Sequence, residues 1–291
     1  MPRMLKNVLS NVLSPEEASQ VYSAFDQIGD IVVIKIPDEL VSKKNLIADT
    51  ILSHVKTAKA VFAQVSPVKG DYRVRNLEFV AGENRTITEY KEHGCRFRVD
   101  VAKTYFSPRL STERLRIAKM VSEGEMIVNM FAGVGTYSIL MARMNKTCTV
   151  YSIDSNAVAA ELCEVNAKLN KVQDRVISIH GDAREVIKDK LACHADRVLM
   201  PLPERAKDFI DSAILALNKK GMVHYFAHIR ADNKKSSQEL GLQDTHNAFV
   251  KYNHLVQQVK VVRGVGPRIY QIVADVSVTT TSSAFPPPLE Q

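Results

Sequence analysis

A glycine turn follows a mainly apolar segment near the middle of the chain. Residues 126–131 are long enough for one buried strand, the turn Ala132-Gly133-Val134-Gly135 comes next, and an apolar helical pattern resumes at residues 137–141. In such a strand–turn–helix unit the glycines let the backbone approach a ligand, and the helix N-terminus offers unpaired N–H groups to it. A Gly-x-Gly turn also occurs as an ordinary tight connection, so other residues must decide between these interpretations.

An acidic residue stands where a nucleotide site needs one. Asp154 ends the next apolar segment, residues 148–153. A carboxylate about 20 residues beyond the turn holds ribose hydroxyls in nucleotide-binding sheets. The turn lacks the third glycine of the dinucleotide fingerprint, however. The combination predicts S-adenosylmethionine, which has a ribose and an adenine but no pyrophosphate.

Further candidates lie at the ends of the other predicted strands, because ligand sites in such sheets form at the carboxyl ends of the strands. Asp182 closes the third strand and is placed to accept a hydrogen bond from the adenine amino group. It is equally suited to be the N-cap of the following helix. The residues predicted to line the cofactor site at these ends are Phe131, Ala132, Gly133, Gly135, Asp154, Ser155, Asp182, Ala183 and Pro201.

The elements that must position these residues alternate along the second part of the chain. Strands are predicted at residues 126–131, 148–153, 175–179, 197–200 and 221–227, with helices at residues 157–170, 185–191 and 204–217. Strands joined by helical crossovers indicate a parallel sheet. The last two strands, residues 259–262 and 269–276, are separated only by residues 263–268, which predicts an antiparallel hairpin. This α/β pattern fits the class I methyltransferase (Rossmann-like) fold better than a dinucleotide dehydrogenase.

The first part of the chain has a different organisation. Ser14-Pro15-Glu16-Glu17 is an N-terminal helix signal, and the predicted helix reaches about residue 25. A strand at residues 30–36 and a helix through residues 46–52 follow. Short alternating strands are predicted at residues 60–65, 77–81, 85–90 and 95–100. We therefore expect a smaller α+β domain at residues 1–105, the catalytic domain at residues 106–278, and a disordered Ser/Thr/Pro-rich tail at residues 279–291.

Charge and composition indicate the class of partner. The net charge is +7 with a pI near 9.1, and basic residues are frequent between Lys56 and Lys103. These residues are either a solvated sheet face or a surface that contacts nucleic-acid phosphates. No apolar run approaches the roughly 20 residues that span a bilayer, so no membrane association is expected. The four cysteines show no C-x-x-C spacing, so we expect no structural metal site and no disulfide framework. A reducing, cytoplasmic location is therefore expected.

Several segments together resemble a known family. They are residues 82–86, Glu92-His93-Gly94-Cys95-Arg96-Phe97, residues 105–114 (Tyr-Phe-Ser-Pro-Arg-Leu-Ser-Thr-Glu-Arg), residues 129–135, residues 151–154, Gly181-Asp182-Ala183-Arg184 and residues 200–203. Over most of its length the chain resembles the archaeal and eukaryotic tRNA (guanine-37-N1)-methyltransferases, which use S-adenosylmethionine. Two of these segments, residues 105–110 and 131–135, are shared mainly with a sister family, the aminocarboxypropyltransferases of wybutosine synthesis, which also use S-adenosylmethionine.

The resemblance implies roles for individual residues. Glu113 matches the general base of the family, and Arg75, or its neighbour Arg73, matches an arginine at the target base. Tyr105, Arg109 and Arg114 match positions that line the cofactor and substrate pocket. The implied substrate is tRNA near the anticodon, and we expect a monomer. Without the resemblance, the favoured interpretation of Glu113 is an acid in the first turn of a helix, where the helix dipole stabilises it.

Two residues depart from the family pattern. Pro201 replaces the asparagine that is expected to orient guanine, and Asn129 stands where an acid is usual. Pro201 leaves aminocarboxypropyl transfer to tRNA open, and both departures leave tRNA binding without catalysis open. The Leu202-Pro203 loop resembles those of other N-methyltransferases, so methylation of a protein or small molecule is a further alternative. The Leu202-Pro203 pair favours methyl transfer because it resembles the methyltransferase loop. Glu113 favours it because N1 of guanine must lose a proton before it reacts.

Overall fold

The protein forms two compact units, Met1–Ser111 and Thr112–Gln291, and each is described by itself. The computed structural model describes residues 8–22, 25–65 and 76–280. The break between the units lies close to the boundary predicted after residue 105.

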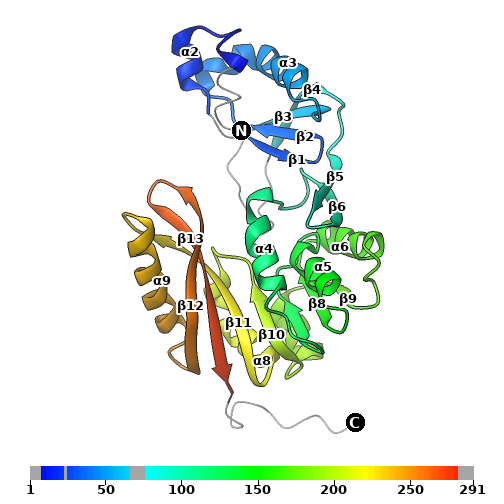
Figure 1. Ribbon diagram of the computed structural model, residues 1–291, viewed down its shortest axis with the longest axis vertical. Helices are drawn as coiled ribbons and strands as arrows, with labels where there is room; N and C mark the ends of the chain where they lie inside the picture. Colours follow the sequence, from blue (N-terminus) through cyan, green and yellow to red (C-terminus); the bar gives the residue numbers. More distant parts are fainter. Residues whose placement is uncertain (1–7, 23–24, 66–75, 281–291) are drawn as a thin grey trace. The chain divides into compact units, whose positions relative to one another are not determined.

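Unit 1 is an α+β domain built on a small sheet (Figure 1). Its elements are α2 (Pro15–Gln20), β1 (Asp26–Ile28), β2 (Ile31–Ile34), η1 (Asp38–Lys43), α3 (Lys44–His54), β3 (Ala60–Gln64), β4 (Leu77–Gly82), β5 (Ile87–Glu92), β6 (Cys95–Asp100) and η2 (Pro108–Leu110). The sheet has the order β1-β2-β3-β4, and β5 and β6 form a separate hairpin. β2 and β3 pair in parallel because α3 carries the chain between them, whereas the other pairs are antiparallel.

Local sequence explains the start of α2. Ser14 accepts a hydrogen bond from the Glu17 N–H, and the Glu17 side chain accepts one from the Ser14 N–H, which completes a capping box with Pro15 at the first helical position. The helix ends at Gln20, earlier than the predicted residue 25, because Val21 has an extended backbone. Val21 is buried in the apolar core of this unit.

Unit 2 contains a seven-stranded mixed sheet (Figure 1). Its elements are α4 (Ser111–Ala118, which starts at the last residue of unit 1), β7 (Met126–Asn129), α5 (Thr136–Met144), β8 (Thr149–Asp154), α6 (Ala157–Leu169), β9 (Val176–His180), α7 (Ala183–Val186), the π-helical η3 (Ile187–Leu191), β10 (Ala195–Met200), η4 (Ala206–Phe209), α8 (Ile210–Ala216), β11 (Leu217–Arg230), α9 (Lys234–Ala248), β12 (Asn253–Gly266) and β13 (Ile269–Thr279). The strand order is β12-β13-β11-β10-β7-β8-β9.

The order of the strands confirms the predicted fold class. β11, β10, β7, β8 and β9 are parallel, so their carboxyl ends lie at one edge of the sheet. β13 lies between β11 and β12 and is antiparallel to both, as the predicted hairpin requires. β13 continues to Thr279, the first residue of the predicted tail, and residues 281–291 lie outside the described residues.

One helix of unit 2 has no counterpart among the sequence predictions. α9 packs on β12, β13 and β11 (Figure 1). Its buried residues are the small side chains Ser237, Gly241 and Thr245, which recur at every fourth position. A Cβ atom at Gly241 would lie 3.2 Å from Val259 Cγ1, so the helix approaches the sheet closely. None of the helices in the described residues has the length and apolar character needed to cross a membrane.

Candidate active site

The turn after β7 has the backbone that its glycines predict. Gly133 (φ +55°) and Gly135 (φ +85°) both lie in the left-handed region, which favours glycine. Gly135 also has a packing reason to lack a side chain, because a Cβ atom there would lie 2.7 Å from the Sγ atom of Cys163 on α6. Close packing between the turn and α6 therefore accounts for Gly135 without a ligand.

Asp154 connects this turn to the end of β8. Its Oδ2 atom accepts a hydrogen bond from the Gly133 N–H at 2.7 Å, and its Oδ1 atom accepts one from the Asn156 N–H at 2.9 Å. Burial raises the pKa of the Asp154 carboxyl, although these two backbone donors oppose the shift. An ionised carboxylate has about four acceptor sites, so two remain for other donors such as ribose hydroxyls.

Asp182 has the local role that was predicted as the alternative to cofactor binding. It is the N-cap of α7 and accepts a hydrogen bond from the Arg184 N–H at 2.8 Å. The Arg184 guanidinium donates to both carboxylate oxygens, at 3.0 and 2.7 Å, and this hydrogen bonding lowers the pKa of Asp182. Contact with an adenine amino group remains a prediction.

Asn129, the residue that departs from the family pattern, is completely buried at the end of β7. Its Nδ2 atom donates to Ser138 Oγ at 3.1 Å, and Ser152 donates to the same oxygen at 2.7 Å. The Asn129 Oδ1 atom has no hydrogen-bond partner among the described residues. Buried acceptors are nearly always paired, so the unpaired Oδ1 atom is an exception at this strand end.

Backbone hydrogen bonds hold the strand ends of unit 2 together. The Ala132 N–H donates to Ile153 O at 2.8 Å, the Gly181 N–H to Asp154 O at 3.0 Å, and the Met130 N–H to Leu199 O at 3.0 Å. The structure thus brings together, along one sheet edge, the predicted residues Phe131, Ala132, Gly133, Gly135, Asp154, Ser155, Asp182, Ala183 and Pro201.

Pro201 begins a tight turn directly after β10. The Leu202 N–H donates to Met200 O at 2.8 Å, and Leu202 O accepts from the N–H groups of Arg205 and Ala206. Pro201 itself has no side-chain donor. The turn therefore supplies shape at this strand end, and other residues must orient a substrate base.

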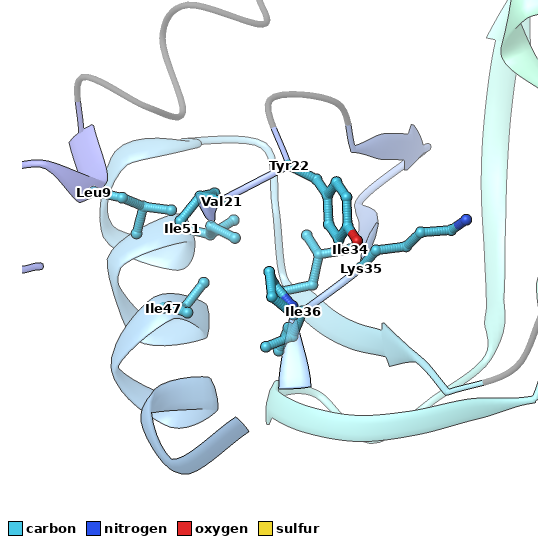
Figure 2. Close-up of a pocket in the computed structure, with 9 residues that line it drawn as sticks. Leu9, Val21, Tyr22, Ile34, Lys35, Ile36, Ile47 and Ile51 are labelled. Atoms are coloured by element: carbon cyan, nitrogen blue, oxygen red, sulfur yellow. The ribbon is translucent and has the colours of Figure 1, made fainter. Parts of the chain in front are cut away.

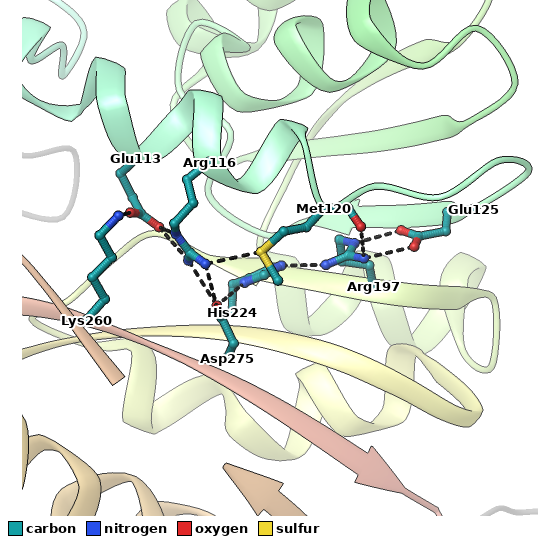
Figure 3. A network of polar contacts seen from close by, with 8 residues as sticks. All are labelled: Glu113, Arg116, Met120, Glu125, Arg197, His224, Lys260 and Asp275. Atoms are coloured by element: carbon teal, nitrogen blue, oxygen red, sulfur yellow. Dashed lines mark hydrogen bonds and ion pairs between the residues drawn. The ribbon is translucent and has the colours of Figure 1, made fainter. Parts of the chain in front are cut away.

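Glu113 lies in the first turn of α4 and is only 3% exposed. Its Oε1 atom accepts from the Arg116 guanidinium, with distances of 2.8 Å to Nε and 2.6 Å to Nη2 (Figure 3). Its Oε2 atom lies 3.7 Å from Lys260 Nζ, which is longer than a hydrogen bond. One carboxylate oxygen is thus fixed and the other is available to a proton.

The remaining predicted residues are dispersed. Arg114 is buried in α4, while Tyr105 and Arg109 belong to unit 1, where Arg109 forms an ion pair with Asp26 at 2.8 Å. Arg75 and its neighbour Arg73 fall outside the described residues.

Two of the basic side chains predicted to contact phosphates have internal partners. The Arg85 guanidinium forks onto the Asp30 carboxylate and also reaches Glu83, and Arg96 pairs with Glu89 at 2.6 and 3.0 Å. Arg98 is an exposed residue of β6. Arg98 is therefore more accessible to a nucleic acid than the half-buried Arg85.

A pocket in unit 1 has a different character (Figure 2). It is lined by Leu9, Val21, Tyr22, Ile34, Lys35, Ile36, Pro37, Ile47 and Ile51. The lining is mostly aliphatic and contains none of the predicted site residues. It offers no carboxylate, and its chemistry is unrelated to that of the sheet edge in unit 2.

Comparison with protein families decides the assignment. Residues 88–261 match the TRM5/TYW2 methyltransferase domain, and residues 5–86 match the TYW2 N-terminal domain. The chain belongs to the TRM5/TYW2 methyltransferase family. The family predicted from sequence is thereby confirmed.

Characterised relatives within this family differ in the reaction that their names describe. The chain is 41% identical to tRNA (guanine(37)-N(1))-methyltransferase Trm5b of Pyrococcus abyssi, over 88% of this chain and 75% of the relative. It is 34% identical to tRNA 4-demethylwyosine(37)-methyltransferase Taw21 of Saccharolobus solfataricus (90% and 96%). It is 32% identical to the tRNA(Phe) (4-demethylwyosine(37)-C(7)) aminocarboxypropyltransferase of Methanocaldococcus jannaschii (86% and 96%).

Solved structures agree with this assignment. A complex of aTrm5 with tRNALeu matches with a TM-score of 0.81 at 35% identity, covering 94% of this chain and 78% of that one. The structure of TYW2 from M. jannaschii in complex with AdoMet matches with a TM-score of 0.67 at 26% identity, covering 89% of this chain and all of that one.

Sequence reasoning missed Arg116, Lys260 and Asp275, which contact Glu113 directly or through one residue. One signal was available. Asp275 interrupts the apolar run of residues 272–276, and a lone acid in a buried strand needs a cationic partner.

Proposed function

We propose that the protein transfers a methyl group from S-adenosylmethionine to N1 of guanine 37 in tRNA. One observation carries this proposal: Glu113 presents a buried carboxylate whose Oε1 atom is held by Arg116 while Oε2 is left for a proton. The family membership and the relatives named guanine-37 methyltransferases support the same reaction.

The site residues have chemistry that suits this cofactor. Asp154 has acceptor sites left for ribose hydroxyls, and Asp182 is placed to accept from an adenine amino group. When bound, S-adenosylmethionine supplies an electrophilic methyl group on its sulfonium.

Glu113 acts on the nucleophile. N1 of guanine carries a proton near neutral pH, and Glu113 removes it during methyl transfer, a role that typically contributes about 10²–10⁴-fold to a rate. Loss of this proton moves negative charge onto O6, where a cation stabilises it. Arg75 is our proposed cation, from the family resemblance.

Basic residues of unit 1 are proposed to bind tRNA phosphates, with Arg98 as an exposed representative. The relative solved in complex with tRNALeu supports tRNA as the partner. We also propose that the protein acts as a monomer in the cytoplasm. Light scattering and cell fractionation test these two points.

A second candidate reaction is modification of 4-demethylwyosine at position 37 by methyl or aminocarboxypropyl transfer. It is favoured by the match of residues 5–86 to the TYW2 N-terminal domain. It is also favoured by two relatives named for reactions on 4-demethylwyosine, because the match spans 96% of each relative's length. Glu113 favours guanine instead, since guanine N1 must be deprotonated. Leu202-Pro203, from its resemblance to the methyltransferase loop, favours methyl over aminocarboxypropyl transfer.

Nucleoside mass spectrometry separates these reactions. The protein is incubated with S-adenosylmethionine and with tRNA that carries either guanine or 4-demethylwyosine at position 37. We expect 1-methylguanosine from the first tRNA and its loss in Glu113→Gln. An aminocarboxypropyl product, or a product from the second tRNA alone, would overturn the proposed reaction. Retained methylation in Glu113→Gln would move the base to another residue.

A further inference from the structure

Glu113 is the end of a buried network of charged side chains (Figure 3). Arg116, on the same helix, bridges Glu113 to Asp275 on β13. Its Nη1 atom donates to Asp275 Oδ2 at 2.6 Å and its Nη2 atom to Oδ1 at 3.0 Å. Glu113 and Asp275 are 3% and 2% exposed. The two-pronged contact with Asp275 fixes the plane of the guanidinium that holds Glu113.

The network continues through a buried histidine. His224 Nδ1 lies 2.6 Å from Asp275 Oδ1, and His224 Nε2 lies 2.7 Å from Arg197 Nη1. Arginine only donates, so Nε2 must accept, and the proton of a neutral imidazole is on Nδ1, facing Asp275. Arg197 in turn pairs with Glu125 at 2.6 and 2.8 Å.

The charges of this network balance. Three acids, Glu113, Asp275 and Glu125, face three cations, Lys260, Arg116 and Arg197, and His224 between them is neutral. Asp275 contacts Arg116 and His224, so it stabilises the arginine that Glu113 contacts. Lys260 is 39% exposed at its side chain and lies farther from Glu113 than Arg116 does. Arg116 is thus the group that sets the carboxylate orientation.

We propose that Asp275, acting through Arg116 with support from His224, is a positioning residue for the Glu113 base. This inference rests on the proposed function, because it takes Glu113 as the base. With Oε1 fixed by Arg116, only Oε2 can accept the proton from guanine. Without Asp275 the guanidinium can rotate, and the direction of the Oε2 lone pairs is no longer defined. A displacement of about 1 Å at a reacting group costs roughly 10²-fold in rate.

The variant Asp275→Asn tests this role, since it keeps the side-chain size but removes the charge. Methyl transfer is measured in a single turnover with saturating tRNA and cofactor, at a temperature where circular dichroism shows a folded protein. We expect the rate to fall by about 10–100-fold. The dissociation constants for S-adenosylmethionine and tRNA should be unchanged.

Arg175→Gln is the matched control. Arg175 is a partly buried arginine before β9, at the opposite edge of the sheet, and donates to Ala142 O at 2.7 Å and Asn145 O at 3.1 Å. Its replacement should lower thermal stability and leave the single-turnover rate unchanged. A purely structural role for Asp275 would give the same result in both variants.

Glu113→Gln, assayed in parallel, separates the role of Glu113 as the base from the positioning role of Asp275. If Glu113→Gln is inactive and Asp275→Asn keeps the wild-type rate, the positioning role is overturned while the base remains. If Glu113→Gln is active, the base assignment itself fails. A loss of affinity for both ligands in Asp275→Asn would also overturn the positioning role.

Arg116→Lys carries the test if Asp275→Asn does not fold. Lysine keeps the positive charge but cannot bridge two carboxylates with a planar fork. The positioning role requires the same loss of rate with unchanged cofactor affinity. A wild-type rate in Arg116→Lys overturns it.

Discussion

Replacing His224 by glutamine should remove part of the acid sensitivity of folding. His224 is completely buried, and this burial lowers its pKa. The Asp275 carboxylate on β13 opposes the shift, while Arg197 on β10 and Arg116 on α4 add to it. The folded protein therefore keeps the imidazole neutral, whereas the unfolded chain binds a proton near the ordinary pKa of 6.5.

The sign and size of the effect follow from this difference in proton binding. The contribution of His224 to stability is fully present above pH 6.5 and is lost as the pH falls below that value, because the unfolded state then binds more protons. One proton changes the free energy of unfolding by about 1.4 kcal/mol per pH unit. Between pH 7 and pH 5.5 the loss is about 1 kcal/mol. Asp275, whose pKa is also lowered, loses its contribution only below its ordinary value of 3.8.

Urea unfolding followed by circular dichroism measures this effect. Glutamine can donate to Asp275 and accept from Arg197 but does not titrate, and the other histidines are common to both proteins. The variant is expected to be less stable than the wild type at pH 7. The difference in unfolding free energy between them should narrow by about 1 kcal/mol at pH 5.5. An equal gap at both pH values would show that His224 binds a proton in the folded protein, and would refute our description of the network.

Three further predictions concern the glycine turn, the cofactor and tRNA. Gly135→Ala should destabilise the protein by about 1–3 kcal/mol in thermal unfolding, because its Cβ meets Cys163 Sγ at 2.7 Å. Adding Cys163→Ala to this variant should restore part of the lost stability. Wild-type stability of Gly135→Ala would contradict the packing role of Gly135. Asp154→Asn should weaken S-adenosylmethionine binding about tenfold or more in calorimetry, because it removes a charged acceptor, and should leave tRNA affinity unchanged. An unchanged cofactor affinity would exclude Asp154 from the site. Arg98→Ala should lower the slope of log binding constant for tRNA against log salt concentration by about one unit. Arg85→Ala should mainly reduce stability, because it breaks the pair with Asp30. An unchanged slope in Arg98→Ala would indicate that this face contacts solvent and not tRNA.

The parts of the fold that sequence predicted are those with regular apolar patterns. The strand near residues 126–129 and the closing hairpin were predicted from short apolar runs and are present. α9 was not predicted because its buried positions are Ser237, Gly241 and Thr245, which give no apolar periodicity. Its close approach to the sheet depends on small side chains, and composition alone does not show this.

The candidate site was predictable only where the sequence spacing within one strand–helix–strand unit determines which residues meet. The turn at Gly133 and the carboxylate of Asp154 are 21 residues apart and form one hydrogen-bonded unit, as their spacing predicts. The partners of Glu113 could not be inferred in the same way. Arg116 and Asp275 are 159 residues apart, and only the order of the strands brings them together. Their pairing depends on β13 inserting beside β11.

The balanced charges around Glu113 also constrain how this protein can change through evolution. A single substitution at Asp275 or Arg197 leaves an uncompensated charge among buried side chains. A buried charge that loses its partner costs about 3–5 kcal/mol. Replacement of a whole pair by apolar residues of similar size is often neutral. Divergence at these positions should therefore occur as coupled exchanges. Arg197 and Glu125 are the pair most open to joint replacement, because they lie at the end of the network away from Glu113.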